Sequence, residues 1–169
     1  MKDRFKFRAG FTISFYDIAG NDVERQIMLD NCFSIDNGGE GICVNEEIIQ
    51  EALDIYVAKD EHKSAWDFIN ANYAETDGYY FIDSVDFLDQ CTGLRDKNGK
   101  LIYENDVVKV SEAYENGIYK IEFCQSDCEY NLYNSKGNFM YQLTKSMARY
   151  MEVIGNIHEN ADLIKVGRK

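Results

Sequence analysis

Apolar and charged side chains alternate over residues 5–9 at the start of the chain. This period of two is typical of a strand with one buried face. A second strand is expected over residues 11–16, and a turn is predicted by Asp17, Gly20, Asn21 and Asp22. We expect residues 23–29 to pair back as the second strand of a hairpin.

Helical spacing follows Asn45, which can cap a helix whose first turn contains Glu46 and Glu47. The two carboxylates suit the positive end of the helix dipole. An apolar stripe supports this helix: Ile48, Ile49, Ala52, Leu53, Tyr56 and Val57. A second short helix is expected from Ser64, whose spacing to Asp67 resembles a capping arrangement. Its predicted inward side chains are Ala65, Trp66, Ile69 and Tyr73, with Trp66 as a core or lid residue.

Short segments rich in aromatic and β-branched residues follow one another, roughly ten residues apart, in the second half of the chain. The sequence Asp-Lys-Asn-Gly at residues 96–99 predicts a tight hairpin turn between two such segments. The expected strands cover residues 79–88, 107–110, 118–123, 130–133, 139–143 and 151–157. This pattern is typical of a small closed sheet, and we expect an SH3-like barrel.

The fold class is therefore expected to be α+β and mainly β. An N-terminal part of strands and helices would cover residues 1–89, and the barrel would cover residues 90–169. Both parts would pack as one compact unit. Acidic residues concentrate in the first part: residues 17–94 hold 18 acidic and three basic side chains, whereas residues 95–169 hold 11 of each. This asymmetry indicates two parts with different surfaces.

Composition excludes several classes of protein. Hydrophobic residues make up 45% and charged residues 28% of the 169, which argues against disordered, collagen-like and coiled-coil chains. Glycine, Asn and Asp must form the turns because the chain contains no proline. We expect no membrane span and no secretory signal. The five cysteines are then expected to be reduced thiols in the cytoplasm.

A family resemblance rests on five segments in the right order. Residues 90–100 have the sequence Gln-Cys-Thr-Gly-Leu-Arg-Asp-Lys-Asn-Gly-Lys, and residues 102–109 continue with Ile-Tyr-Glu-Asn-Asp-Val-Val-Lys. Three further segments support the resemblance: Lys-Phe-Arg-Ala at residues 6–9, Tyr-Asn-Leu-Tyr at 130–133 and Glu-Val-Ile-Gly-Asn-Ile-His-Glu-Asn at 152–160. The chain resembles the YopX family of phage and prophage proteins.

The resemblance implies a fold and a phage origin, with no established activity and no catalytic residues to carry over. Cys91 departs from the family pattern, in which an aromatic residue is usual. Asn105 stands where glycine is usual. Because Asn is well suited to replace a glycine at positive φ, we expect the turn at Asn105 to keep its geometry.

The segments that carry the resemblance have two interpretations. In the structural one, they set turns and close backbone contacts. The turn-setting residues would be Gly93, Asn98, Gly99, Asn105, Gly155 and Asn156. In the functional one, Thr92, Arg95, Tyr103 and Asp106 converge on one rim of the barrel and recognise a ligand or partner. The sequence leaves both open.

Catalytic and metal-binding patterns are weak, so we expect no enzyme, no cofactor and no metal. Neither His62 nor His158 lies beside a nucleophile motif. Cys124 and Cys128 do not have zinc-knuckle spacing, and no second pair accompanies them. Asp83, Asp86 and Asp89 are expected to form a solvated acidic edge.

Aromatic residues make up 14% of the chain, more than one core needs, which favours an interface. We expect a non-enzymatic accessory protein in the cytoplasm of a bacterial host, acting by self-association as a homo-oligomer or by binding a host or phage protein. A first alternative is an acidic, DNA-mimic-like inhibitor of a host nucleic-acid-binding protein. A second is a nucleic-acid-binding barrel, which the charge balance disfavours. Its basic patch would comprise Lys2, Lys6, Arg8, Arg168 and Lys169.

Overall fold

A computed structural model describes residues 6–17, 19–35, 41–76, 78–82, 85–111 and 114–164. The chain divides into two compact units, with the boundary between Asp89 and Gln90. We call the part that ends at Asp89 the first unit and the part that begins at Gln90 the second unit. Strands outnumber helices among the described residues of both, so the expected α+β, mainly β class is confirmed.

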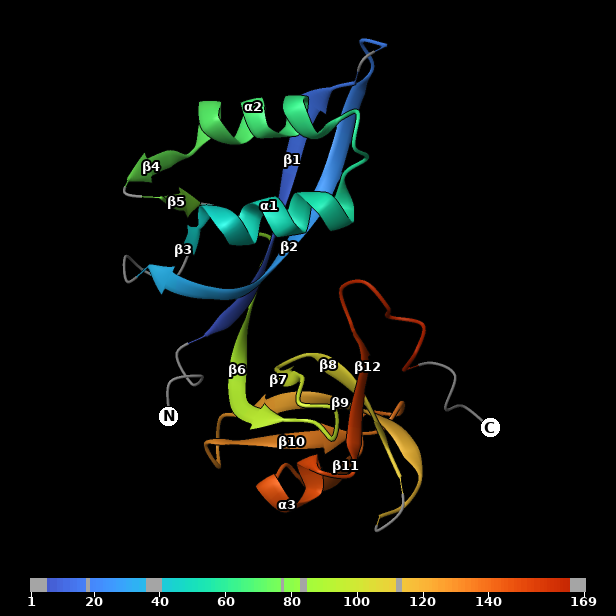
Figure 1. The fold of residues 1–169 in the computed structure, drawn as a ribbon. Helices are drawn as coiled ribbons and strands as arrows, with labels where there is room; N and C mark the ends of the chain where they lie inside the picture. The colour runs from blue at the N-terminus through green and yellow to red at the C-terminus, as the bar shows by residue number, and fades with distance from the viewer. Residues whose placement is uncertain are drawn as a thin grey trace. The chain divides into compact units, whose positions relative to one another are not determined.

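The first unit is an antiparallel sheet with the strand order β4-β5-β3-β2-β1 and with helices α1 and α2 packed against it (Figure 1). Its elements are β1 (Phe7–Tyr16), β2 (Asp22–Ile35), β3 (Gly41–Asn45), α1 (Glu46–Tyr56), α2 (His62–Asn72), β4 (Ala74–Thr76) and β5 (Tyr79–Ile82). Its core consists of side chains from these strands and helices, among them Phe11, Ile13, Ile27, Leu29, Ile42, Ile49, Leu53 and Ile69.

Local sequence predicts several of these elements well. Asn45 caps α1 as expected, because its side-chain oxygen accepts a hydrogen bond from the Glu47 N–H at 2.8 Å. The predicted hairpin is also confirmed, since β1 and β2 pair antiparallel from Tyr16↔Asp22 onwards. Asn37 and the glycines at 38, 39 and 41 also predict a loop; residues 36–40 lie outside the described residues, and Gly41 begins β3.

Four boundaries in the first unit were predicted wrongly, the first being the end of β2, which runs to Ile35 rather than residue 29. β1 is one strand rather than two, because Gly10 stays in the sheet. A Cβ at Gly10 would lie 2.1 Å from the Phe87 ring, so glycine makes room for that ring. α2 begins at His62 rather than Ser64, and Glu61 precedes it without a side-chain cap. The expected strand over residues 79–88 is divided, since β5 ends at Ile82 and the next strand begins at Phe87.

The second unit contains a five-stranded antiparallel sheet with the order β11-β10-β9-β8-β12, together with a β6–β7 hairpin (Figure 1). Strand β6 (Phe87–Arg95) begins before the unit boundary and ends after it. The other elements are β7 (Leu101–Tyr103), β8 (Asp106–Val110), β9 (Gly117–Cys124), β10 (Glu129–Tyr133), β11 (Phe139–Gln142), α3 (Lys145–Ala148) and β12 (Met151–Asn156). Its core includes Ile102, Val108, Val110, Ile121, Leu132, Met147 and Met151.

The strands predicted after residue 100 are confirmed to within about a residue at most ends. α3 was not predicted because four residues are too few to show a helical period. Its N-cap is Thr144, whose hydroxyl oxygen accepts from the Met147 N–H at 3.2 Å. Strand β4 was also missed. In the described part of the chain, no helix has the length and apolar character needed to cross a bilayer.

Candidate functional site

Asp96 connects the β6–β7 hairpin to the last strand of the second unit. Its side chain is buried, and Oδ1 accepts hydrogen bonds from the backbone N–H groups of Asn98 and Lys100, at 2.8 and 2.9 Å. Its Oδ2 accepts from the Val153 N–H of β12 at 3.0 Å. Gly99 closes the turn at a φ of +84°, which favours glycine. The Asp-Lys-Asn-Gly sequence therefore forms a turn, and Asp96 joins this turn to β12 by a hydrogen bond.

Asn105 and Asp106 form the tight turn between β7 and β8. Asn105 has a φ of 62°, which confirms the expectation that Asn replaces glycine there at positive φ. The fully buried Asp106 accepts from the Tyr103 N–H at 2.8 Å. The Asn105 N–H donates to the Ile121 carbonyl at 2.9 Å, and the Asn105 carbonyl accepts from the Ile157 N–H at 3.0 Å. One turn thus binds the backbone of two further segments.

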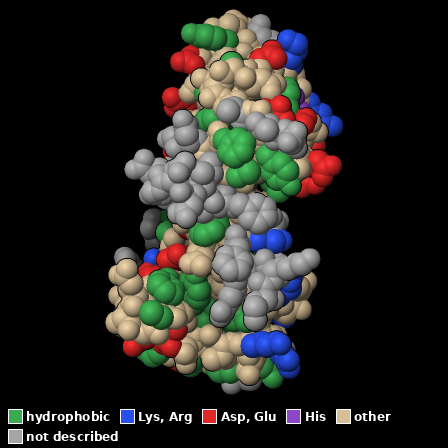
Figure 2. Space-filling model, turned by 90° about the vertical axis from the view of Figure 1, so that its left-hand side faces the viewer, with side chains coloured by type: hydrophobic (Ala, Val, Ile, Leu, Met, Phe, Trp, Pro, Cys, Tyr) green, Lys and Arg blue, Asp and Glu red, His purple; other side chains and the backbone are tan. Residues whose placement is uncertain are grey.

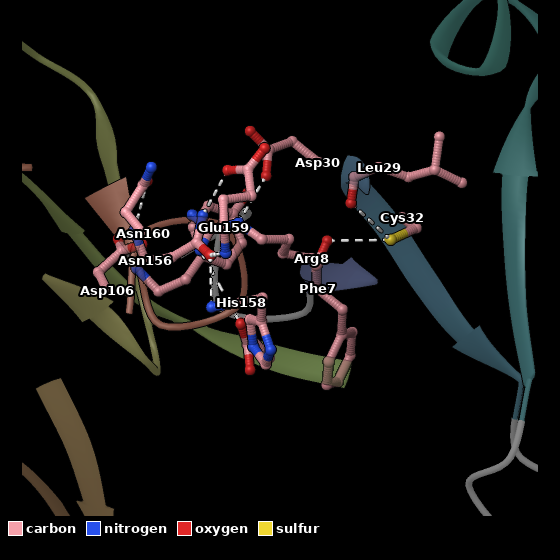
Figure 3. A network of polar contacts seen from close by, with 12 residues as sticks. Phe7, Arg8, Leu29, Asp30, Cys32, Asp106, Asn156, His158, Glu159 and Asn160 are labelled. Carbon is pink, nitrogen blue, oxygen red and sulfur yellow. Dashed lines mark hydrogen bonds and ion pairs between the residues drawn. The ribbon is translucent and has the colours of Figure 1, made fainter. Parts of the chain in front are cut away.

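Asn156 organises the turn that follows β12, as Figure 3 shows. Its Oδ1 accepts from the backbone N–H groups of His158 and Glu159, both at 2.9 Å. Its Nδ2 donates to the Glu159 carboxylate at 2.7 Å. A Cβ at Gly155 would lie 2.3 Å from the Asn160 side-chain oxygen, so a larger residue would displace Asn160. These contacts give Gly155 and Asn156 a structural role.

The four residues predicted to recognise a ligand differ in exposure. Thr92, Tyr103 and Asp106 are buried, whereas Arg95 is exposed. The Thr92 hydroxyl donates to the Ile102 carbonyl at 2.8 Å. Arg95 donates to the Gly99 carbonyl of its own hairpin at 2.8 Å. The structure thus uses the polar atoms of Thr92 and Asp106 within the sheet rather than on an exposed rim.

A pocket of about 460 Å³ opens beside this hairpin, and sequence analysis did not predict it. Phe123 and Tyr130 lie directly opposite each other on β9 and β10, with ring centroids 5.1 Å apart. Phe123 shares the core-facing side of β9 with Tyr119 and Ile121, because side chains alternate along a strand. The pocket is therefore the open end of the hydrophobic core. Its lining comprises Gln90, Cys91, Thr92, Leu94, Phe123, Cys128, Glu129, Tyr130, Leu143 and Lys145.

Two charged side chains lie in the lining of this pocket. Glu129 is half-buried and accepts a hydrogen bond from the Gln142 side chain. Lys145 begins α3 and is exposed, and no ion pair engages it among the residues that the structure describes. Lys145 therefore presents a hydrated ammonium group that is available to an anion. The resulting chemistry is an aromatic and aliphatic floor beside one available positive charge.

The predicted acidic edge is wrong for Asp89. Asp86 is exposed, and its carboxylate accepts from Thr12 at 2.9 Å and from Gln26 at 3.1 Å. Asp89 is buried, with a carboxylate oxygen 3.9 Å from the buried Arg8 guanidinium. Asp89 is buried because Arg8 offsets its charge, which burial would otherwise penalise. The third member of the predicted edge, Asp83, lies outside the described residues.

The cysteines have contrasting surroundings. Cys128 is exposed in the β9–β10 turn, and the Cys124 thiol lies 3.2 Å from a carboxylate oxygen of Asp127. Cys32 is buried in the first unit beside the Phe7 and Leu29 carbonyls (Figure 3), and burial raises the pKa of its thiol to about 12. Within the described ranges, no three His, Cys, Asp or Glu side chains are arranged to hold a metal ion.

Comparison with known families gives a match over residues 43–165 to the family described as YopX protein. The chain belongs to the YopX family. No curated protein matches this YopX chain. Among solved structures, the crystal structure of protein EF1440 from Enterococcus faecalis is similar, with 18% sequence identity and a TM-score of 0.38. That similarity covers 92% of the YopX chain and 97% of the other chain.

Proposed function

We propose that this YopX-family chain is a non-enzymatic accessory protein of a phage or prophage that binds another protein in the bacterial cytoplasm. The observation that carries the proposal is the pocket of about 460 Å³ at the open end of the second unit's core. Its volume lies within the range of ligand and side-chain pockets, roughly 300–1,000 Å³. A partially exposed aromatic pair in such a pocket is typical of a protein interface.

The occupant we infer is an aromatic or aliphatic side chain on a partner segment that also carries a carboxylate. The apolar side chain would pack against Phe123, which is 40% exposed, and against Tyr130. The carboxylate would pair with Lys145 at the edge of the pocket. The apolar contact would supply the larger part of the affinity, because an exposed ion pair contributes only about 0–1 kcal/mol.

The fold of the second unit supports a binding role. We propose that it is an SH3-like barrel, because four strands follow each other as a meander and a short helix precedes a last strand that pairs with the first. Such small barrels leave the ends of their cores accessible to partners.

Self-association is the second form of this proposal, with a homo-oligomer as the product. The specific observation in its favour is a set of large hydrophobic side chains at the surface, and Figure 2 shows hydrophobic side chains reaching the surface between charged ones. The exposed ones are Tyr16, Ile55, Tyr79, Phe81, Phe123 and Phe139. The acidic-inhibitor alternative rests on the first unit, where residues 5–89 hold 18 acidic and five basic side chains.

The test compares Phe123→Ala and Lys145→Glu with Phe139→Ala, a matched loss of an exposed aromatic outside the pocket lining. Partners captured from infected host lysate by the full chain are purified and titrated against each variant. We expect Phe123→Ala to weaken binding at least tenfold, Lys145→Glu severalfold, and Phe139→Ala less than twofold. Equal binding by Phe123→Ala and the unmodified chain overturns the proposal.

Light scattering on the same variants distinguishes the occupants. An oligomer that dissociates only in Phe123→Ala assigns the pocket to a second copy of the chain. Salt-dependent retention on DNA that survives both pocket substitutions favours the nucleic-acid-binding alternative instead. Competition with DNA for a host protein, again independent of Phe123, favours the acidic inhibitor.

A further inference from the structure

The first unit contains a groove between its two helices that the proposed function does not use. Its volume is about 350 Å³. Helix α1 contributes Leu53 and Asp54 to the groove, and α2 contributes Trp66. The groove and the C-terminal pocket belong to different units, so a ligand of the groove requires no residue of the pocket.

Trp66 is a fixed aromatic platform in this groove. Its indole packs edge-on against the buried Tyr80 ring, with centroids 5.6 Å apart and an interplanar angle of 66°. The Tyr80 hydroxyl donates to the Asn70 side chain at 2.6 Å, which holds the Tyr80 ring in place. Trp66 is half-buried and lines the groove, so part of its indole is accessible to a ligand.

Lys63 in the groove lining is already paired, whereas the carboxylates of Glu47 and Glu51, on α1 outside that lining, are accessible. Lys63 forms an ion pair with Asp67 at 3.1 Å. In the part of the chain that the structure describes, no ion pair engages Glu47 or Glu51, and both side chains are exposed. The Asp54 side chain is 70% exposed, and a carboxylate oxygen lies 3.6 Å from His62 Nδ1, a contact that is an ion pair only when the imidazole is protonated. An incoming cation therefore meets accessible carboxylates.

The three carboxylates form a line along one helix face. Glu47, Glu51 and Asp54 stand at positions i, i+4 and i+7 of α1, so they are neighbours on successive turns. Glu47 and Glu51 are separated by four residues, a rise of about 6 Å along the helix. Alternate residues of an extended segment are separated by about 6.6 Å on one side. An extended partner with cations at alternate positions matches the Glu47–Glu51 spacing, whereas Glu51 and Asp54 are separated by a rise of only about 4.5 Å, which long side chains must bridge at an angle.

We propose that the groove between α1 and α2 docks an arginine-rich, extended segment of a partner protein. One guanidinium stacks on the Trp66 indole and pairs with Asp54, and the next arginines pair with Glu51 and Glu47. Arginine fits better than lysine because its planar guanidinium stacks on aromatic faces and binds carboxylates through two hydrogen bonds. The net negative charge of the unit speeds the encounter with such a basic segment.

The test uses the full chain and three peptides of 12 residues, in which serine alternates with Arg, Lys or Glu. Trp66 is the only tryptophan in the chain, so its fluorescence reports occupation of the groove directly. At 150 mM salt, we expect the Arg peptide to change the emission with a saturable curve. The Lys peptide should bind severalfold more weakly, and the Glu peptide should cause no change.

Two charge-reversal variants separate docking from general attraction. Asp54→Lys should weaken binding of the Arg peptide at least tenfold. Glu24→Lys makes the same change of charge at an exposed strand position outside the groove lining, and we expect less than a twofold effect. Circular dichroism verifies that each variant is folded.

Three results would overturn the proposal: equal weakening by Asp54→Lys and Glu24→Lys, equal affinity for the Arg and Lys peptides, or an unchanged Trp66 emission. A single-stranded oligonucleotide that produces the same saturable change would also overturn it. Phe123→Ala in the second unit should leave the titration unaltered, which separates this inference from the proposed function.

Discussion

The two units are stabilised in different ways. The first unit buries mostly apolar side chains between a sheet and two helices, with Arg8 and Asp89 as a buried charged pair. The second unit has a smaller apolar core and buries the turn-forming side chains Asp96, Asp106 and Asn156. An apolar core tolerates many residues of similar volume, whereas a buried carboxylate that accepts backbone hydrogen bonds tolerates few. This difference explains why the motif residues concentrate in the second unit.

A buried thiol in each unit allows the stability of the two to be measured separately. Cys32 lies in the first unit and Cys91 in the second, and both are almost completely buried. Alkylation of each thiol at increasing urea concentration, followed by mass spectrometry, reports the unfolding of its own unit. A substitution that destabilises one unit alone should therefore expose one thiol and leave the other protected.

The largest effect is expected from Phe11→Ala in the first unit. Phe11 is 1% exposed and makes an edge-to-face contact with Tyr73 at 5.8 Å. The lost contacts and the cavity should reduce the free energy of unfolding by about 4 kcal/mol. Cys32 should become reactive at lower urea while Cys91 stays protected. Tyr16→Ala, on the same strand and 68% exposed, is the control. A parallel shift at Cys91 would show that the two units unfold together.

A somewhat smaller effect is expected from Asp96→Ala in the second unit. The substitution removes the acceptors of three backbone N–H groups, and the free energy of unfolding should fall by about 3 kcal/mol. Cys91 should be alkylated at a lower urea concentration than in the unmodified chain, whereas the urea concentration at which Cys32 is alkylated should not change. Asp96→Asn keeps one oxygen acceptor, so its free energy of unfolding should lie between those of Asp96→Ala and the unmodified chain. Asp127 is an exposed acid in the same unit, and Asp127→Ala should change the free energy of unfolding little. If Asp96→Ala reduces the free energy of unfolding no more than Asp127→Ala does, the structural role of the hairpin is disproved.

The smallest expected effect is a pH dependence of the free energy of unfolding of the first unit. Burial raises the pKa of the Cys32 thiol from 9.0 to about 12. Between these values the unfolded chain loses the thiol proton and the folded chain keeps it, so stability falls as pH rises. From pH 9 to 10.5 the loss should be about 1.5 kcal/mol. Burial also raises the pKa of Tyr80, which acts in the same direction.

Urea unfolding followed by Trp66 fluorescence measures this loss, because Trp66 lies in the first unit. Cys32→Ala should remove most of the decrease and leave the part due to Tyr80 and to Cys43, whose thiol pKa is also raised by burial. A decrease of the same size in Cys32→Ala would contradict the assignment to the thiol.

Local sequence predicted those elements whose cause is local. Asn45 caps α1 through a side chain two residues from its donor, and Gly99 adopts a positive φ within its own turn. The boundary of α2 was missed because Glu61 precedes it without a side-chain cap, so the local signal at Ser64 misplaced its start. The uninterrupted β1 depends on Phe87, far away in the sequence, which packs over Gly10.

The amino-acid sequence by itself determined the mainly β class, the strand positions after residue 100 and the YopX resemblance, because alternation, turn residues and motifs act over a few residues. The tertiary structure alone decided that Asp89 is buried beside Arg8 and that Asp96 bonds to β12. It also placed Phe123 and Lys145 beside the β6 residues that line the pocket. Such contacts join segments far apart in the chain, and no local pattern encodes which segments will meet.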